Sequence, residues 1–161
     1  MSECNMRVAV PGDEELILDF IHQLAVYEKM DDQVVATPEL LRLWIFEKHK
    51  AEVVFAEAEG ETVGFALFFH NFSTFLGRAG IYLEDLFVRP EFRGRGYGKA
   101  LLSHLAGTAV ERGCGRLEWA CLDWNRPSID FYTKKMQAVP MDEWTVYRLT
   151  GDTLKRAAEG T

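Results

Sequence analysis

The sequence predicts an α/β or α+β layer fold with a central mixed sheet, and two observations lead to this prediction. Apolar residues recur at helical spacing in the N-terminal third, and three consecutive β-prone runs then precede a glycine-rich turn and a long helical pattern. The predicted order is β α α β β β α β α β, without an internal repeat or a linker, as in helices layered on one sheet. At 161 residues we expect a single domain, residues 1–161.

The N-terminal third is predicted to hold one short strand and two helices. An apolar run, residues 6–10, ends at Pro11-Gly12 and indicates an edge strand. Residues 13–29 carry apolar side chains at helical spacing and predict an amphipathic helix. Thr37-Pro38 supplies an N-cap and a first helical residue for a second helix, which runs to about residue 48.

The rest of the chain is predicted to alternate between strands and helices. Two β-rich runs, residues 52–58 and 62–70, are joined by a hairpin signal, and a third strand, residues 81–88, is antiparallel to the second. The main helix, residues 96–112, is expected to bury Leu101, Leu102, Leu105 and Val110. After it we expect a strand (116–122), a short helix capped by Ser128 and ending near residue 135, a last strand (143–149) and a helical tail (152–158).

The composition limits the classes of function. Hydrophobic residues make up 48% and charged residues 27%, which is ordinary for a globular protein. The formal net charge of −7 argues against nucleic acid as the main partner, because phosphate binding needs a basic surface. No apolar run reaches membrane-spanning length, and the N-terminus does not have the pattern of a signal peptide. The three cysteines form no Cys-x-x-Cys pair, so we expect a reduced, cytoplasmic compartment.

One stretch, residues 81–106, joins a β-prone run, a glycine- and arginine-rich turn and a helical pattern. Free N–H groups in a first helical turn, together with the helix dipole, favour an anion such as pyrophosphate at this turn. A P-loop would need a glycine and a hydroxyl where the chain has Arg93 and Ala100. A dinucleotide fingerprint would need a glycine where the chain has Lys99 or Leu101. Both of these nucleotide loops are therefore excluded.

The spacing that fits is Arg-x-x-Gly-x-Gly, spelled Arg93-Gly94-Arg95-Gly96-Tyr97-Gly98. It resembles the acetyl-CoA loop of the GNAT superfamily of N-acetyltransferases. Nearly the whole chain resembles the diamine (spermidine/spermine) N-acetyltransferases of this superfamily. The sequence of residues 122–125 is closer to that of the thialysine-acetylating members. The resemblance implies a GNAT-type fold with a mostly antiparallel mixed sheet. One departure is Met136, since the family usually has a glycine after its tyrosine-bearing helix. The matching segments are Tyr27-Glu28, Leu83-Glu84-Asp85, Asp123-Trp124-Asn125, Ser128-Ile129-Asp130-Phe131-Tyr132 and Glu143-Trp144.

The implied reaction brings a neutral amine to the thioester carbonyl of acetyl-CoA, without an acyl-enzyme. A primary amine such as that of lysine, with a pKa of about 10.4, is mostly protonated at neutral pH, so a carboxylate must take its proton directly or through a water. The resemblance implies Glu84 as the base or water-positioning group and Tyr132 as the acid towards sulfur. The alternatives are a solvent-facing carboxylate for Glu84 and a core tyrosine for Tyr132.

The resemblance also implies contacts to both substrates. Leu86, Phe87 and Val88 would offer backbone groups to the pantetheine arm, as an added strand does. For four of the residues named below, a role other than substrate binding stays open. Arg95 could be a solvated side chain, Asn125 could only cap its turn, and Glu28 and Asp85 could be ordinary surface acids. The implied acetyl-CoA contacts, beyond those strand residues, are Arg93, Gly94, Arg95, Gly96, Tyr97, Gly98, Lys99, Asn125 and Ser128. The implied amine contacts are Tyr27, Glu28, Glu84, Asp85, Glu118, Trp119, Ala120 and Glu143.

The expected partners are a small cationic amine, acetyl-CoA and a second copy of the chain. The family implies a homodimer, with residues 144–149 as the place of contact. We expect no metal, because the four histidines are scattered without ligand spacing, and neither nucleic acid nor membrane as a partner. Two further functions stay open, an acetyltransferase of a drug or protein amine and a non-catalytic CoA-binding sensor. Intact Glu84 and Tyr132 favour an enzyme, while the identity of the amine is not fixed by the sequence.

Overall fold

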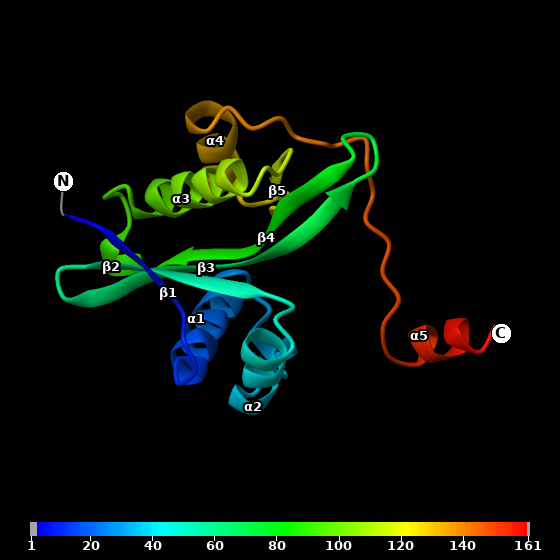
Figure 1. Ribbon diagram of the computed structural model, residues 1–161. Coiled ribbons are helices and arrows are strands. Elements are labelled where there is room, and N and C mark those ends of the chain that lie inside the picture. Colours follow the sequence, from blue (N-terminus) through cyan, green and yellow to red (C-terminus); the bar gives the residue numbers. More distant parts are fainter. Residues whose placement is uncertain (1–2, 161) are drawn as a thin grey trace. The chain divides into compact units, whose positions relative to one another are not determined.

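The computed structural model describes residues 3–160 (Figure 1). By its internal contacts the chain separates into two compact units, Met1–Leu122 and Asp123–Thr161, and each is described by itself. The single domain expected from chain length stays a prediction. Among the described residues, no helix is both long enough and apolar enough to cross a membrane.

The first unit is built on one mixed sheet in which the strands follow chain order. The strands are β1 (Asn5–Val8), β2 (Glu52–Ala58), β3 (Glu61–Ser73), β4 (Arg78–Val88) and β5 (Leu117–Trp119). Antiparallel pairing joins successive strands from β1 to β4, and β5 pairs parallel to β4. This confirms the predicted mostly antiparallel sheet. Strands β3 and β4 are longer than the predicted runs 62–70 and 81–88, because their pairing continues to Ser73 and Arg78 at the hairpin tip.

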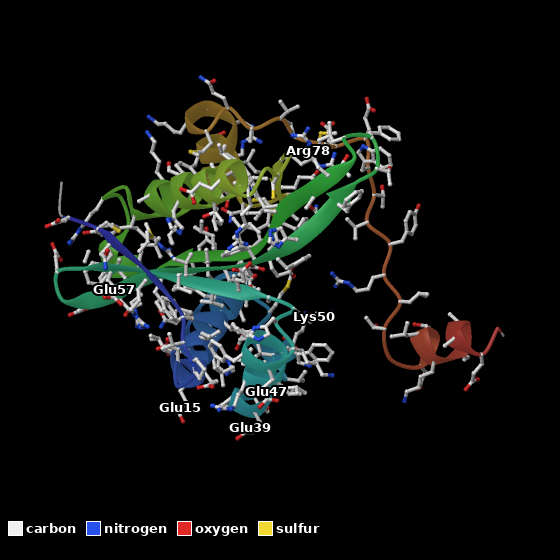
Figure 2. All side chains as sticks on the ribbon, viewed as in Figure 1. Glu15, Glu39, Glu47, Lys50, Glu57 and Arg78 are labelled. Atoms are coloured by element: carbon white, nitrogen blue, oxygen red, sulfur yellow. The ribbon has the colours of Figure 1, made fainter. Side chains whose placement is uncertain are left out.

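Helices cover both faces of this sheet. In Figure 1, α1 (Glu14–Tyr27) and α2 (Pro38–Leu41) lie on one face and α3 (Tyr97–Glu111) on the other. The Thr37 hydroxyl accepts a hydrogen bond from the Leu40 amide at 3.2 Å, which confirms the predicted cap of the second helix. That helix continues beyond α2 as a π-helical segment, Arg42–Glu47. Exposed acids such as Glu15 and Glu39 mark the outer side of α1 and α2 (Figure 2).

The core has one apolar layer on each face of the sheet. Against α1, the Phe20 ring stacks on Phe65 with centroids 5.0 Å apart. On the α3 face, Leu101, Leu102 and Leu105 are fully buried, as predicted. The prediction that Val110 is buried is wrong, because Val110 is 78% exposed. At 3.6 residues per turn it lies opposite Leu101 on the helix, and Ala109 is buried instead.

The second unit contains two helical segments and corrects two predictions. α4 (Arg126–Asp130) runs on into a π turn, Phe131–Lys135, and α5 (Gly151–Ala158) follows later. The predicted Ser128 cap is wrong, since the Ser128 amide donates to the Asn125 side chain at 3.4 Å, which makes Asn125 the cap. The predicted last strand, residues 143–149, does not form, because a strand needs a paired neighbour and the described part of this unit holds none.

Candidate active site

A register slip in β4 places the candidate catalytic carboxylates. Leu83 lies opposite Phe68 of β3, whereas Asp85 lies opposite the next residue, Leu67, so Glu84 is the extra residue of a β-bulge. Strict alternation would put Asp85 on the same face as Leu83. The slip instead puts Asp85 on the face of Phe87, whose ring packs 6.5 Å from Phe20 of α1. Bulges re-aim side chains in this way and are frequent beside active sites.

Three acidic residues meet at this bulge, and within residues 3–160 no basic side chain pairs with them. Asp85 is partly buried, Glu84 is exposed, and Glu28 closes the C-terminal end of α1. Burial, followed by the charges of Glu84 and then Glu28, raises the pKa of Asp85 to about 7. Burial and then the charge of Glu84 also raise the pKa of Glu28. The bulge therefore creates a site that favours a proton or another cation.

Arg93 braces the end of β4 against α1. Its Nε donates a hydrogen bond to the Val88 carbonyl oxygen at 3.0 Å. Its guanidinium lies over the rings of Tyr27 and Phe87, 4.9 and 5.0 Å from their centroids. Tyr27 in turn packs edge-on against Phe87 at 6.5 Å. Arg93 thus holds the Tyr27 and Phe87 rings together and has a structural role in addition to the predicted contact with pyrophosphate.

The glycine-rich turn has the backbone geometry that an anion site needs. Gly94 and Gly96 adopt left-handed backbone angles, with φ of 77° and 89°, which side-chain-bearing residues rarely reach. Gly96 is the N-cap of α3, so the amides of the first helical turn have no acceptor within the helix. A Cβ at Gly98 would lie 3.9 Å from Leu86 and Val88 side chains, so β4 and the turn approach closely. These features fit a pyrophosphate, as the sequence predicts.

Arg95, the second predicted charge partner, lies on the surface next to an acid. Its Nη1 is 3.2 Å from a carboxylate oxygen of Glu59 in the β2–β3 turn, and its side chain is about half exposed. An exposed ion pair of this kind contributes little to stability, so the Arg95 guanidinium can leave Glu59 for another anion at little cost. A pyrophosphate at the turn would compete with Glu59 for the Arg95 guanidinium.

Strands β4 and β5 pair over only a short length. Pairing runs from Ile81–Leu117 to Leu83–Trp119, and β4 then continues to Val88 without a paired neighbour on that side among the described residues. The unpaired backbone of Leu86 to Val88 is where the sequence predicts contact with the pantetheine arm. Within β5, Glu118 is held by Asn71 at 3.1 Å and by Arg116 at 2.9 Å. Its charge is therefore partly neutralised, unlike that of the bulge acids.

Four predicted site residues belong to the second unit. Asn125 is buried and caps α4, and Ser128 donates its amide to that cap. Tyr132 lies in the π turn after α4, with its ring 5.6 Å from Phe131, and its backbone carbonyl accepts from the Ala138 amide at 2.9 Å. Glu143 lies in exposed chain outside any helix or strand. The functional roles of these residues stay predictions.

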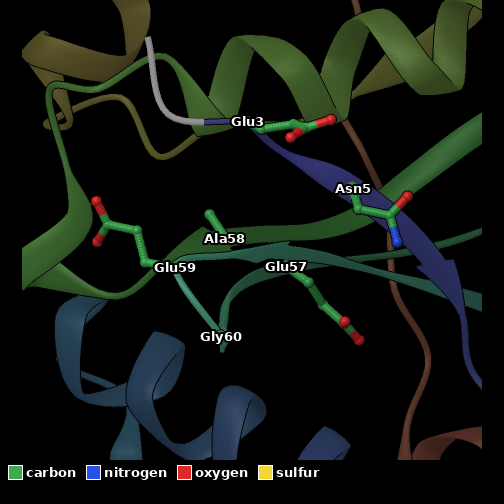
Figure 3. Close-up of a pocket in the computed structure, with 6 residues that line it drawn as sticks. All are labelled: Glu3, Asn5, Glu57, Ala58, Glu59 and Gly60. Atoms are coloured by element: carbon green, nitrogen blue, oxygen red, sulfur yellow. The ribbon is translucent and has the colours of Figure 1, made fainter.

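A separate hollow lies at the β2–β3 turn and contains none of the predicted site residues (Figure 3). Two of its acids already have partners, since Glu57 pairs with Arg7 and Glu59 with Arg95. Within residues 3–160, no group of three or more His, Cys, Asp or Glu side chains is arranged to hold a metal ion. The residues around the hollow are Glu3, Asn5, Glu57, Ala58, Glu59 and Gly60.

The sequence pattern of the acetyltransferase (GNAT) family matches residues 18–137. The chain belongs to this family. It is 37% identical to the thialysine N-epsilon-acetyltransferase of Bos taurus over 165 residues, which cover 95% of this chain and 96% of that protein. It is 33% identical to L-ornithine N5-acetyltransferase NATA1 of Arabidopsis thaliana, with 93% and 86% covered. An integron cassette protein from the mobile metagenome of V. cholerae has a similar structure, with a TM-score of 0.81, 27% identity and 99% of both chains covered.

These findings confirm that the chain is a GNAT N-acetyltransferase that acts on amines. They also confirm the likeness to the thialysine and spermidine/spermine branch. What the sequence analysis missed in this acetyltransferase is the bulge, although a signal for it exists. The signal is only the position of two adjacent acids, Glu84 and Asp85, within a run that is otherwise hydrophobic from residue 81 to residue 88. Successive residues of a regular strand face opposite sides, so one of the two acids is expected on the side that helices cover.

Proposed function

We propose that this acetyltransferase moves the acetyl group of acetyl-CoA to a primary amine of a small cationic substrate, a polyamine or a lysine-like amino acid such as thialysine. One observation carries the choice of a cationic substrate, namely the three acids at the β4 bulge. Glu28, Glu84 and Asp85 repel one another and have no basic partner among the described residues. Glu28 also closes the C-terminal end of α1, where the helix dipole favours a positive charge. A substrate ammonium group relieves both effects.

For acetyl-CoA, the proposal uses the unpaired end of β4 and the glycine-rich turn. The backbone of Leu86, Phe87 and Val88 pairs with the pantetheine arm, and the amides of residues 94–99 bind the pyrophosphate. The two left-handed glycines and the N-terminus of α3 support this assignment. Arg93 and Arg95 add positive charge beside the phosphates, and Asn125 and Ser128 contact the far part of CoA.

For the chemistry, Glu84 acts as the base or positions the water through which the ammonium proton leaves, and Tyr132 protonates the departing sulfur. Primary amines are mostly protonated at neutral pH, so this proton must be removed before nitrogen attacks the thioester carbonyl. The amine is further held by Tyr27 and by the β5 segment Glu118 to Ala120, and Glu143 contacts its far end. Direct attack within a ternary complex needs no metal.

The proposed assembly is a cytoplasmic homodimer in which residues 144–149 contact the second copy. Trp144, Val146 and Tyr147 are 77%, 81% and 90% exposed, which is unusual for a run of apolar side chains. A partner strand would bury these side chains and pair their backbone. Sedimentation equilibrium of the chain and of a variant with Val146→Lys and Tyr147→Lys tests this part of the proposal. A monomeric wild-type chain contradicts it.

The deciding experiment is thiol release from acetyl-CoA across a panel of amines. We expect release with spermidine, putrescine or thialysine, and little with aminoglycosides or a protein lysine. Release only with aminoglycosides or a protein amine supports the second candidate, an acetyltransferase of drugs or proteins. Tight acetyl-CoA binding without release in the presence of any amine supports a CoA-binding sensor instead. Tyr132→Phe and Glu84→Gln should both lower turnover, and wild-type rates in both would contradict the assigned roles.

A further inference from the structure

A network of polar side chains crosses strands β3, β4 and β5. The Nδ2 group of Asn71 in β3 donates a hydrogen bond to Oε1 of Glu118 in β5 at 3.1 Å, although β4 lies between the two strands. Gly80 of β4 makes this reach possible, because a Cβ there would lie 2.5 Å from Oδ1 of Asn71. Arg116, which precedes β5, pairs with the same Glu118 oxygen, with its Nε at 2.9 Å. The missing side chain at Gly80 thus lets Asn71, Glu118 and Arg116 form one network.

This network lies on the same face of the sheet as Asp85. Asp85 is opposite Leu67 in the register of β3 and β4, and Asn71 follows Leu67 by four residues along β3. Residues two and four positions apart in a strand point to the same face. On β4, Tyr82 lies opposite Glu118 of β5 and so shares this face with it. The bulge and the network are therefore two polar places on one side of the sheet.

The separation of these two places matches the length of a lysine side chain. Burial, followed by the charges of Glu84 and then Glu118, raises the pKa of Tyr82, so both carboxylates lie near this one residue. Along β4, Tyr82 is followed by the bulge acids two and three residues later, about 7–10 Å away at the rise of a strand. The five bonds from the amino nitrogen of lysine to its Cα span about 6 Å when extended. The acid side chains themselves cover the remainder.

Glu118 and Arg116 both keep polar atoms that are open to a ligand. Glu118 uses Oε1 for both of its partners, and within residues 3–160 no hydrogen bond reaches its Oε2. In the same part of the chain, the terminal guanidinium nitrogens of Arg116 donate no hydrogen bond. The two side chains are 34% and 44% exposed, respectively. The network therefore presents a free acceptor and free donors next to each other.

We propose that Glu118 and Arg116 bind the α-ammonium and the α-carboxylate of an amino-acid substrate whose distant amine reaches the bulge acids. This inference rests on the N-acetyltransferase function proposed above and narrows its substrate to a lysine-like amino acid. Each charge of the amino-acid head group meets an opposite charge, and Arg116 can hold the carboxylate through two N–H groups. The second ammonium of a diamine meets Arg116 as well as Glu118, so repulsion offsets the attraction.

Asn71 acts in this site as a positioning residue for Glu118. Its Oδ1 is buried and has no hydrogen-bond partner among the described residues. A buried carbonyl oxygen without a partner lowers stability, so packing alone does not favour asparagine at this place. The amide instead supplies the hydrogen bond that holds Oε1 of Glu118 and leaves Oε2 for the ligand. An apolar side chain of the same size should therefore harm substrate binding without harming the fold.

Thiol release with two matched amines tests the inference. Thialysine and its decarboxylated counterpart, bis(2-aminoethyl) sulfide, share the reacting amine and the chain length and differ in the α-carboxylate. For the wild-type chain we expect kcat/KM to be about tenfold or more higher with thialysine, since a charge-assisted contact is lost with the diamine. Arg116→Gln should lower kcat/KM for thialysine about 5- to 100-fold for the same reason. The same variant should raise kcat/KM for the diamine, because it removes a repelling cation.

Two further variants test the other members of the network. Glu118→Gln should raise KM for both amines, because both carry a second ammonium group. Asn71→Leu should raise KM for thialysine about three- to tenfold, should lower kcat by less, and should not lower the free energy of unfolding in urea. A purely structural asparagine would show the reverse, a loss of stability with an unchanged KM. Arg156→Gln on the exposed α5 is the matched control and should keep the wild-type preference.

Three results separate the possible failures. A loss of less than about fivefold in kcat/KM for thialysine in Arg116→Gln overturns the inference and leaves the proposed function standing. Equal losses for thialysine and the diamine in this variant, or a wild-type chain that prefers the diamine, overturn it as well, because a contact with the carboxylate must discriminate between them. Absence of thiol release by the wild-type chain with every amine in the panel instead overturns the proposed function itself.

Discussion

Replacing Asp85 by asparagine is expected to stabilise the protein by an amount that grows with pH. The pKa of Asp85 rises from its ordinary value of 3.8 to about 7 in the folded protein, chiefly because the side chain is buried. Between these two values the folded protein binds a proton that the unfolded chain has lost, so the stability of the wild type falls as pH rises. Each pKa unit corresponds to 1.36 kcal/mol, so the whole effect is at most about 4 kcal/mol. About 2–3 kcal/mol of it should develop between pH 5 and pH 8. Asparagine has nearly the same shape as aspartate and no charge, so the stability of the Asp85→Asn variant should not fall with rising pH in this way.

Urea unfolding at several pH values, followed by the fluorescence of the four tryptophans, measures this difference. The free energy of unfolding of Asp85→Asn should exceed that of the wild type by more at pH 8 than at pH 5. The same Asp→Asn change at the exposed Asp152 should alter stability by less than about 0.5 kcal/mol at every pH. A difference between Asp85→Asn and the wild type that is independent of pH, or that grows toward low pH, would refute the burial of a proton-binding carboxylate at the bulge.

Three other substitutions test the structure around the site and the π turn. Gly64→Ala should cost about 1–3 kcal/mol in urea unfolding, because the new Cβ would lie 2.8 Å from the Phe87 carbonyl oxygen, while Gly107→Ala on the open side of α3 should not destabilise. Equal stability of the Gly64→Ala and Gly107→Ala variants would contradict the close approach of Gly64 to the Phe87 carbonyl oxygen. Gln137→Gly should raise the melting temperature, with a gain of up to about 1 kcal/mol, because Gln137 has a φ of 57°; a lower melting temperature would count against that backbone conformation. Arg93→Gln should lose about 1–2 kcal/mol of stability and weaken amine binding, and unchanged values of both would show that its ring contacts are unimportant.

Most of the fold could be predicted from local patterns because each element of the first unit contains its own signal. The hairpin between β2 and β3 and the cap at Thr37 both occur where the sequence predicts them. The errors arise where a neighbour decides the outcome. Residues 143–149 have a β-prone sequence, but a strand exists only when another strand pairs with it. Cap choice at α4 likewise depends on one hydrogen bond, which Asn125 makes in place of Ser128.

The candidate site could be predicted only as a set of residues. The resemblance brought Glu28, Glu84 and Asp85 together and implied a catalytic role for Glu84, yet it did not distinguish the two acids of β4 by their burial. That distinction comes from the one-residue slip between β3 and β4, which moves Asp85 to the face of α1. The Tyr27 and Phe87 rings, which pack together, come from elements that are far apart in the sequence. Desolvation of a carboxylate is a property of the packed structure, so no spacing rule in the sequence could supply it.

The same burial that destabilises the empty protein at higher pH prepares the site for a cation. When Asp85 loses its proton, three acids face one another at the bulge without a basic partner among the described residues. An ammonium group that enters then replaces the lost proton, and its attraction is larger in a partly dry site than in bulk water. By linkage, a ligand that binds only the folded protein restores the stability that deprotonation removed. Amine binding and loss of the Asp85 proton are therefore coupled, so an ammonium group that binds at the bulge should lower the pKa of Asp85.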